Sequence, residues 1–119
     1  MSGPPADAGR RVVLHVTTVP ITMMFNAGQA RWLAARGWSV HAACAAGPLL
    51  DRYAAETGAR VHPVPMSRRL EPAADARALA AMVRVMRAVR PTVVHAQSPK
   101  GALVGLTAAR LAGVPARFY

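Results

Sequence analysis

Short apolar segments alternate with longer amphipathic segments along most of the chain, and this alternation limits the folds that the chain can adopt. The apolar runs predict strands, and the segments between them have helical spacing. The predicted strands are 11–17, 38–44, 59–64, 92–96 and 114–119, and the predicted helices are 22–36, 47–58, 72–90 and 98–113. Because these strands are apolar throughout, we expect an α/β fold in which helices cover both faces of a parallel sheet.

The connection between the third and fourth predicted strands is the longest, and we place the return of the chain across the sheet there. Since crossovers between parallel strands are right-handed, this placement predicts a Rossmann-like sheet with strand order 3-2-1-4-5. Ligands of such sheets bind beyond the carboxyl ends of the strands at the point where the order reverses. Residues 17–26 and 95–101 would line that crevice.

Composition excludes several classes of protein. The chain has 53% apolar residues, which is enough for a core, and a single cysteine, Cys44, which excludes an internal disulfide. The longest uncharged run, 12–30, contains too many polar residues to span a membrane. We therefore expect a cytoplasmic protein. Residues 1–10 are rich in proline, glycine and alanine, and we expect them to form a flexible leader.

The segment 95–101 joins a predicted strand to a predicted helix and carries the strongest site signal. Ser98 and Pro99 have the pattern of an N-cap followed by proline in the first turn, where backbone amides bind anions. Lys100, the only lysine of the chain, would add a positive charge, and Gly101 would let a ligand approach the backbone. The alternative is an ordinary capped helix with a solvated lysine.

Thr17 and Thr18 follow the first predicted strand, where their hydroxyls would either contact a sugar or phosphate or cap the next helix. No glycine-rich dinucleotide fingerprint follows that strand, which argues against a nicotinamide cofactor. The four histidines, one in each of the first four predicted strands, are His15, His41, His62 and His95. We expect packed histidines rather than a metal site, and we expect Cys44 to be a small buried residue.

The helix 72–90 has a basic face in a chain of net charge +10. Its arginines and those of the preceding segment, which together are candidates for docking on anionic lipid, are Arg68, Arg69, Arg77, Arg84 and Arg87. The alternative is an ordinary solvated face. Nucleic acid fits less well, because only 5% of the residues are aromatic and no binding module is recognised.

Several motifs, taken in their order and spacing, carry a resemblance to one enzyme family. They are VLHVTTVP at 13–20, GQA at 28–30, LAARG at 33–37, GPLL at 47–50, VPMSR at 64–68, VVHAQSPKG at 93–101 and ARLAGVP at 109–115. They resemble the start of a retaining GT-B, family-4-type glycosyltransferase, and most nearly the enzymes of capsule, O-antigen and exopolysaccharide assembly. The resemblance covers residues 11–119, as an incomplete N-terminal domain that ends within its sheet.

The resemblance implies an enzyme of two Rossmann-like domains that transfers a sugar from a nucleotide-sugar to a glycan or lipid-linked acceptor. The N-terminal domain holds the acceptor, often at the inner face of the membrane. The C-terminal domain holds the donor and the paired glutamates, and this chain has no counterpart of it. We therefore expect the chain to be inactive without a donor domain in cis or in trans. The alternatives are a non-catalytic binding module completed by a partner protein, and part of a GT-B-type sugar-nucleotide epimerase.

In that resemblance, Thr17 and Thr18 line the cleft, with no metal and no cofactor other than the donor. The residues expected to contact acceptor or phosphate are His95, Gln97, Ser98, Lys100 and Gly101. Two features depart from the family pattern. Residues 19–24 lack the glycine-rich turn near the donor phosphates, and Gln97 replaces a second histidine, so it can bond a hydroxyl but cannot take a proton.

Overall fold

The computed structural model describes residues 11–67 and 69–119, and it has the predicted alternation of strands and helices. The expected leader, residues 1–10, lies outside the described residues. The elements are β1 (Val12–Val16), α1 (Pro20–Met24), α2 (Ala27–Ala35), β2 (Ser39–Cys44), α3 (Pro48–Thr57), β3 (Arg60–Pro63), α4 (Pro72–Val89), β4 (Val93–Ala96), α5 (Pro99–Ala112) and β5 (Ala116–Phe118). None of the helices within the described ranges is long and apolar enough to cross a membrane.

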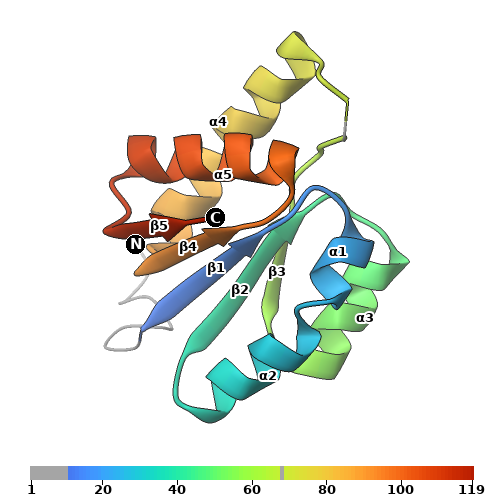
Figure 1. Cartoon of the computed structure of the whole chain (residues 1–119), viewed down its shortest axis with the longest axis vertical. Helices are drawn as coiled ribbons and strands as arrows, with labels where there is room; N and C mark the ends of the chain where they lie inside the picture. The colour runs from blue at the N-terminus through green and yellow to red at the C-terminus, as the bar shows by residue number, and fades with distance from the viewer. Residues whose placement is uncertain (1–10, 68) are drawn as a thin grey trace, which may run out of the picture.

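The five strands form one parallel sheet with the order β3-β2-β1-β4-β5, which confirms the predicted topology. Figure 1 shows α4 and α5 on one face of this sheet and α1, α2 and α3 on the other. The long connection that contains α4 carries the chain from the β3 edge to β4, beside β1. The order therefore reverses between β1 and β4, as expected.

Alternate residues of the strands supply two separate cores, because successive side chains of a strand point to opposite faces. The core under α4 and α5 includes Leu14, Val16, Val94, Ala96, Met82, Met86, Val104 and Ala108. The core under α1, α2 and α3 includes Val13, Ala42, Cys44, Met23, Ala30, Leu50 and Tyr53. Cys44 is a buried free cysteine, as the sequence predicted.

One predicted helix is wrong in its boundaries. The expected single helix 22–36 is two helices, because α1 begins at Pro20 and ends at Met24, and α2 begins only at Ala27. Pro20 opens a helix here, where its missing N–H costs nothing. The break falls at Asn26, whose backbone leaves helical geometry (φ −92°, ψ 2°). The break directs the Asn26 side chain toward the residues that follow β4.

Candidate functional site

The candidate site lies where β1 and β4 end side by side. These strands pair in parallel, from Val13 opposite Val93 to Val16 opposite Ala96. The chain then leaves β1 toward α1 on one face and leaves β4 toward α5 on the other face (Figure 1). In this architecture the ligand crevice is expected beyond the carboxyl edge of the sheet, between two connections that diverge in this way.

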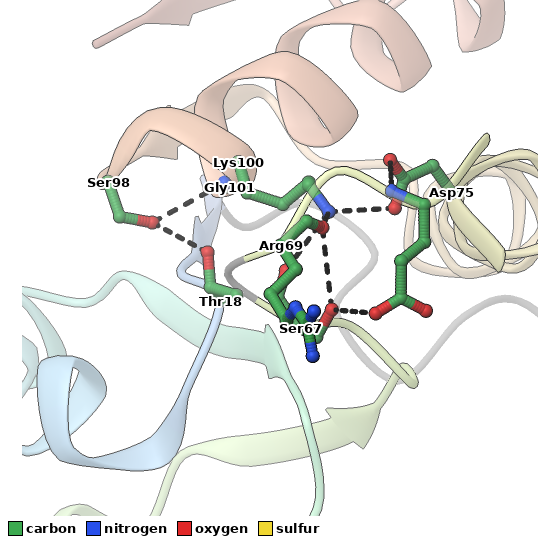
Figure 2. Close-up of polar contacts among 8 residues, drawn as sticks. Thr18, Ser67, Arg69, Asp75, Ser98, Lys100 and Gly101 are labelled. Atoms are coloured by element: carbon green, nitrogen blue, oxygen red, sulfur yellow. Dashed lines mark hydrogen bonds and ion pairs between the residues drawn. The ribbon is translucent and has the colours of Figure 1, made fainter.

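Four polar side chains bridge the two connections, and we call them the hydroxyl–amide cluster: Thr18, Asn26, Gln97 and Ser98. The hydroxyl oxygens of Thr18 and Ser98 lie 2.8 Å apart in a hydrogen bond (Figure 2). The side-chain amide of Asn26 donates to Oε1 of Gln97 at 2.6 Å. Thr18 is buried, whereas Gln97 and Ser98 are half-buried. The cluster is electrically neutral, and its outer members reach solvent.

Ser98 is the N-cap of α5, as the sequence predicted. Its hydroxyl oxygen accepts from the Gly101 amide at 3.4 Å. Its backbone has φ +72° and ψ 151°, a region that is almost exclusive to glycine. A non-glycine residue is held there only when its surroundings over-determine it, and the bonds of the Ser98 hydroxyl to Gly101 and Thr18 provide that constraint.

The Thr17 hydroxyl donates to the carbonyl of Val19 at 3.1 Å, and Thr17 is fully buried. The hydroxyl therefore bonds within the turn that follows β1 and does not cap α1, whose N-cap is Val19. Gly101 packs against the same residue, since a Cβ at position 101 would lie 3.1 Å from the Thr17 Cα and 2.9 Å from the Ser98 Oγ. The absence of a side chain at Gly101 therefore lets the backbone of Thr17 approach, whereas we expected it to let a ligand approach.

Lys100 is buried, and its ammonium group points away from the crevice. Nζ donates to the carbonyl of Ser67 at 3.0 Å, to the carbonyl of Arg69, and to Oδ1 of Asp75 at 2.7 Å (Figure 2). We call this the ammonium cluster: Lys100, Asp75 and the carbonyls of Ser67 and Arg69. The hydrogen bond from Lys100 holds the pKa of Asp75 below its usual value. An ammonium has three donors, so all of them are engaged within the protein. The lysine is therefore not solvated, and no donor remains for a phosphate in this arrangement.

His95 lies beside the crevice on the face of α1–α3. Its ring stacks on Phe118 at 4.4 Å and lies 5.3 Å from the ring of His15. Burial lowers the pKa of His95, so the neutral ring prevails at pH 7. His15 is more deeply buried, and burial together with the neighbouring His95 lowers its pKa to about 4.

The remaining histidines lie apart from the crevice. Nδ1 of His41 and Nε2 of His62 are 2.9 Å apart, and the two rings stack. Within residues 11–67 and 69–119, no group of three or more histidine, cysteine or acidic side chains could hold a metal ion.

The arginines of α4 that we expected to dock on lipid lie at two separate places along the helix. Arg77 and Arg84 line a groove of about 630 Å³ between α4 and residues 65–67. Arg87 lines a different hollow, near the carboxyl end of α4. Arg69, Arg77, Arg84 and Arg87 are all exposed, and Arg68 lies outside the described residues. The predicted basic face of α4 is thus exposed, but its arginines line two separate depressions.

Sequence reasoning did not predict Ser67 and Asp75 as contributors to this region, and it included Asn26 only as the last of the crevice-lining residues 17–26. Asn26 carried a signal, because asparagine is a poor helix former and stood inside a predicted helix. Asp75 stands in the first turn of α4, where an acidic residue suits the helix dipole without any further partner. Its partner lies 25 residues away, and Ser67 acts through its carbonyl, which leaves no mark in the sequence.

Comparison with known proteins gives a family match and one curated relative. The model of the family described as glycosyl transferase 4-like domain matches residues 25–118. The capsular polysaccharide biosynthesis glycosyltransferase CapM of Staphylococcus aureus is 28% identical over 107 residues. That alignment covers 90% of this chain and 27% of CapM, so the chain spans about a quarter of the length of this relative.

Solved structures share the fold. MurG of Acinetobacter baumannii superposes with a TM-score of 0.68 at 18% identity, over 89% of this chain and 32% of its own. A UDP-GlcNAc 2-epimerase of Neisseria meningitidis, bound to UDP-GlcNAc, superposes with a TM-score of 0.62 at 12% identity. The superposition covers 90% of this chain and 31% of the epimerase chain. The chain therefore spans about a third of the length of these solved structures. Since the family model matches most of its length, the chain belongs to the glycosyl transferase 4-like domain family.

Proposed function

We propose that the chain is the acceptor-side part of a glycosyltransferase, which transfers a sugar from a nucleotide-sugar donor to a glycan or a lipid-linked sugar. One observation carries the proposal: a neutral hydroxyl–amide cluster lies at the switch point of the sheet in a member of this family. Hydroxyl and amide groups both donate and accept hydrogen bonds, which matches the hydroxyl groups of a sugar.

The half-buried members of the cluster are the proposed contacts with the acceptor. Gln97 and Ser98 reach solvent, and each can exchange its present partner for a sugar hydroxyl. His95, neutral at pH 7, can donate from one ring nitrogen and accept at the other. Thr17, Thr18 and Gly101 support the turn and the helix start from below. Held in this way, the acceptor would present one hydroxyl to the donor, so the contribution of these residues is positioning.

The proposal is tested by the binding preference of the 119-residue chain. The probes are a monosaccharide linked through pyrophosphate to a short prenyl chain, and UDP-GlcNAc. We expect the chain to bind the first probe and to bind UDP-GlcNAc weakly or not at all, because the donor is held by the domain that this chain does not match. Replacing Gln97 with leucine should weaken binding of the first probe about ten-fold, with Gln29→Leu on α2 as the matched control. Preference for UDP-GlcNAc would favour the epimerase alternative.

We further propose that the arginines of α4 bring the protein to the inner face of an anionic membrane. Arg77, Arg84 and Arg87 are exposed, and each basic residue near such a surface contributes about 1 kcal/mol. Changing all three to glutamate should abolish sedimentation with vesicles rich in phosphatidylglycerol. The matched control makes the same change of charge elsewhere, at the exposed Arg31, Arg52 and Arg110, and should still sediment. If both triple variants lose sedimentation equally, the net charge of the protein explains binding to the vesicles, and the position of the arginines on α4 does not.

A further inference from the structure

Among the residues that the structure describes, Lys100 has an environment that is unusual for its type. Lysine side chains are almost never fully buried unless they are paired, yet only 6% of Lys100 is exposed. It is also the single lysine in a chain whose other 14 basic residues are arginine. The one ammonium side chain of the sequence is therefore the buried one.

The acceptors of this ammonium come from a segment far away in the sequence. Two are the carbonyls of Ser67 and Arg69, between β3 and α4, and the third is the carboxylate of Asp75 in the first turn of α4. The same segment is tied to itself, because the Asp75 carboxylate also accepts from the Glu71 amide at 3.1 Å. The Ser67 hydroxyl donates to Glu71 at 3.2 Å. One buried cation therefore fastens Ser67, Arg69 and Asp75 to the start of α5 (Figure 2).

The contacts of Lys100 lie between two features of the site, the hydroxyl–amide cluster and the groove along α4. On one side, Ser98 and Gly101 of the same helical turn hold the hydroxyl–amide cluster. On the other side, Ser67 and Asp75 line the groove of about 630 Å³ along α4. Lys100 thus links the groove wall to the helical turn that carries Ser98 of the cluster.

We propose that Lys100 is a positioning residue for the acceptor, which holds the groove wall at a set distance from the hydroxyl–amide cluster. This inference rests on the proposed function. An acceptor that contacts Gln97 and Ser98 and extends along α4 would span both parts, so their spacing would decide how well it fits. Arginine would not replace Lys100, because its planar guanidinium directs its donors in a fixed fork, whereas an ammonium turns three donors toward acceptors from three directions.

The test compares Lys100→Met, Lys100→Arg and Asp75→Asn in the 119-residue chain, with two readouts. Hydrogen exchange of the amides of residues 69–75 reports whether the connection is fastened. The dissociation constant of the prenyl-pyrophosphate monosaccharide reports whether the fastening matters to the acceptor. For Lys100→Met we expect exchange at residues 69–75 to accelerate and the probe to bind about ten-fold more weakly, while exchange in β1 and β2 stays unchanged. Lys100→Arg should give the same two changes, faster exchange at residues 69–75 and weaker binding of the probe.

Asp75→Asn keeps the fold testable if Lys100→Met does not fold, because it retains an oxygen acceptor. It should loosen the same segment to a smaller degree. Wild-type binding of the probe with an unchanged dissociation constant in the variants would overturn the inference and leave the proposed function intact. Failure of the wild-type chain to bind the probe would instead contradict the proposed function. Full rescue by Lys100→Arg would overturn the requirement for an ammonium.

Discussion

The two polar clusters on either side of the first turn of α5 satisfy their hydrogen-bonding groups in opposite ways. In the hydroxyl–amide cluster, neutral groups pair with one another, and two of the four reach solvent. In the ammonium cluster, a charged group is buried and every donor is engaged. Neutral half-buried bonds can be exchanged for bonds to a ligand at little cost, whereas a buried charge cannot lose its partners cheaply. This difference is the basis of our two proposals, that the neutral cluster binds the acceptor and that the charged cluster supports it.

The largest expected effect comes from removing the buried ammonium. Lys100→Met should lower the free energy of unfolding by about 3 kcal/mol, because two carbonyls and a carboxylate lose their donor at once. The matched control is Arg52→Met, which breaks an ion pair of similar length, 2.6 Å to Glu56, that is exposed on α3. That control should cost less than about 0.5 kcal/mol. Urea denaturation measures the free energy of unfolding of both variants. An equal loss in Lys100→Met and Arg52→Met would show that the buried ammonium contributes no more than an exposed ion pair.

A smaller effect on stability is expected where the start of α5 contacts Thr17, the residue that follows β1. Gly101→Ala should cost about 2 kcal/mol, since the new Cβ would lie 3.1 Å from the backbone of Thr17. Gly28→Ala in α2 is the control, because no atom lies within 4 Å of the added Cβ. It should stabilise the chain by about 0.5 kcal/mol through helix propensity. Thermal unfolding of the two variants, shifted in opposite directions, would confirm the close approach.

The cap of α5 allows a finer test, because two effects oppose each other at one residue. Ser98→Ala should cost about 1 kcal/mol through loss of the cap and of the bond to Thr18. Ser98→Gly loses the same bonds but relieves the backbone at φ +72°, so its cost should be smaller. If the glycine variant is the less stable of the two in urea, the backbone of Ser98 is not strained.

The smallest effect concerns acid. The pKa of Asp75 is lower in the folded chain than in the unfolded chain, so its stabilisation is complete above the unfolded value of about 3.8. It is lost as the pH falls through the lower folded value. The stability difference between the wild type and Asp75→Asn should therefore shrink as the pH falls below about 4. His15, whose pKa is lowered to about 4, titrates in both proteins and cancels in the difference. A difference that grows toward acid would contradict the assignment.

Local signals predicted most of the fold. Apolar runs gave the strands, the longest connection gave the crossover, and Ser98 with Pro99 gave the start of α5. These features depend on residues close together in the chain, so a sequence pattern records them. The expected match to a glycosyltransferase family is likewise confirmed over residues 25–118.

The parts that could not be predicted depend on distant partners. Asn26 leaves the helix and bonds Gln97, 71 residues away. Lys100 reaches carbonyl groups, which every residue has, so no side-chain pattern marks them. A lysine at a helix start is also compatible with a solvated charge, and only the position of the β3–α4 connection decides between the two.

The central claim is that the acceptor binds the neutral cluster and leaves the charged one closed. The most direct measurement is NMR titration of the chain, labelled with ¹⁵N, with the prenyl-pyrophosphate monosaccharide. Asn26 is the only asparagine and Lys100 the only lysine, so one side-chain signal reports on each cluster. We predict that the side-chain amide signals of Asn26 and Gln97 shift with added probe, while the Lys100 ammonium signal does not. A shift of the Lys100 signal without a shift of the amides would contradict the account.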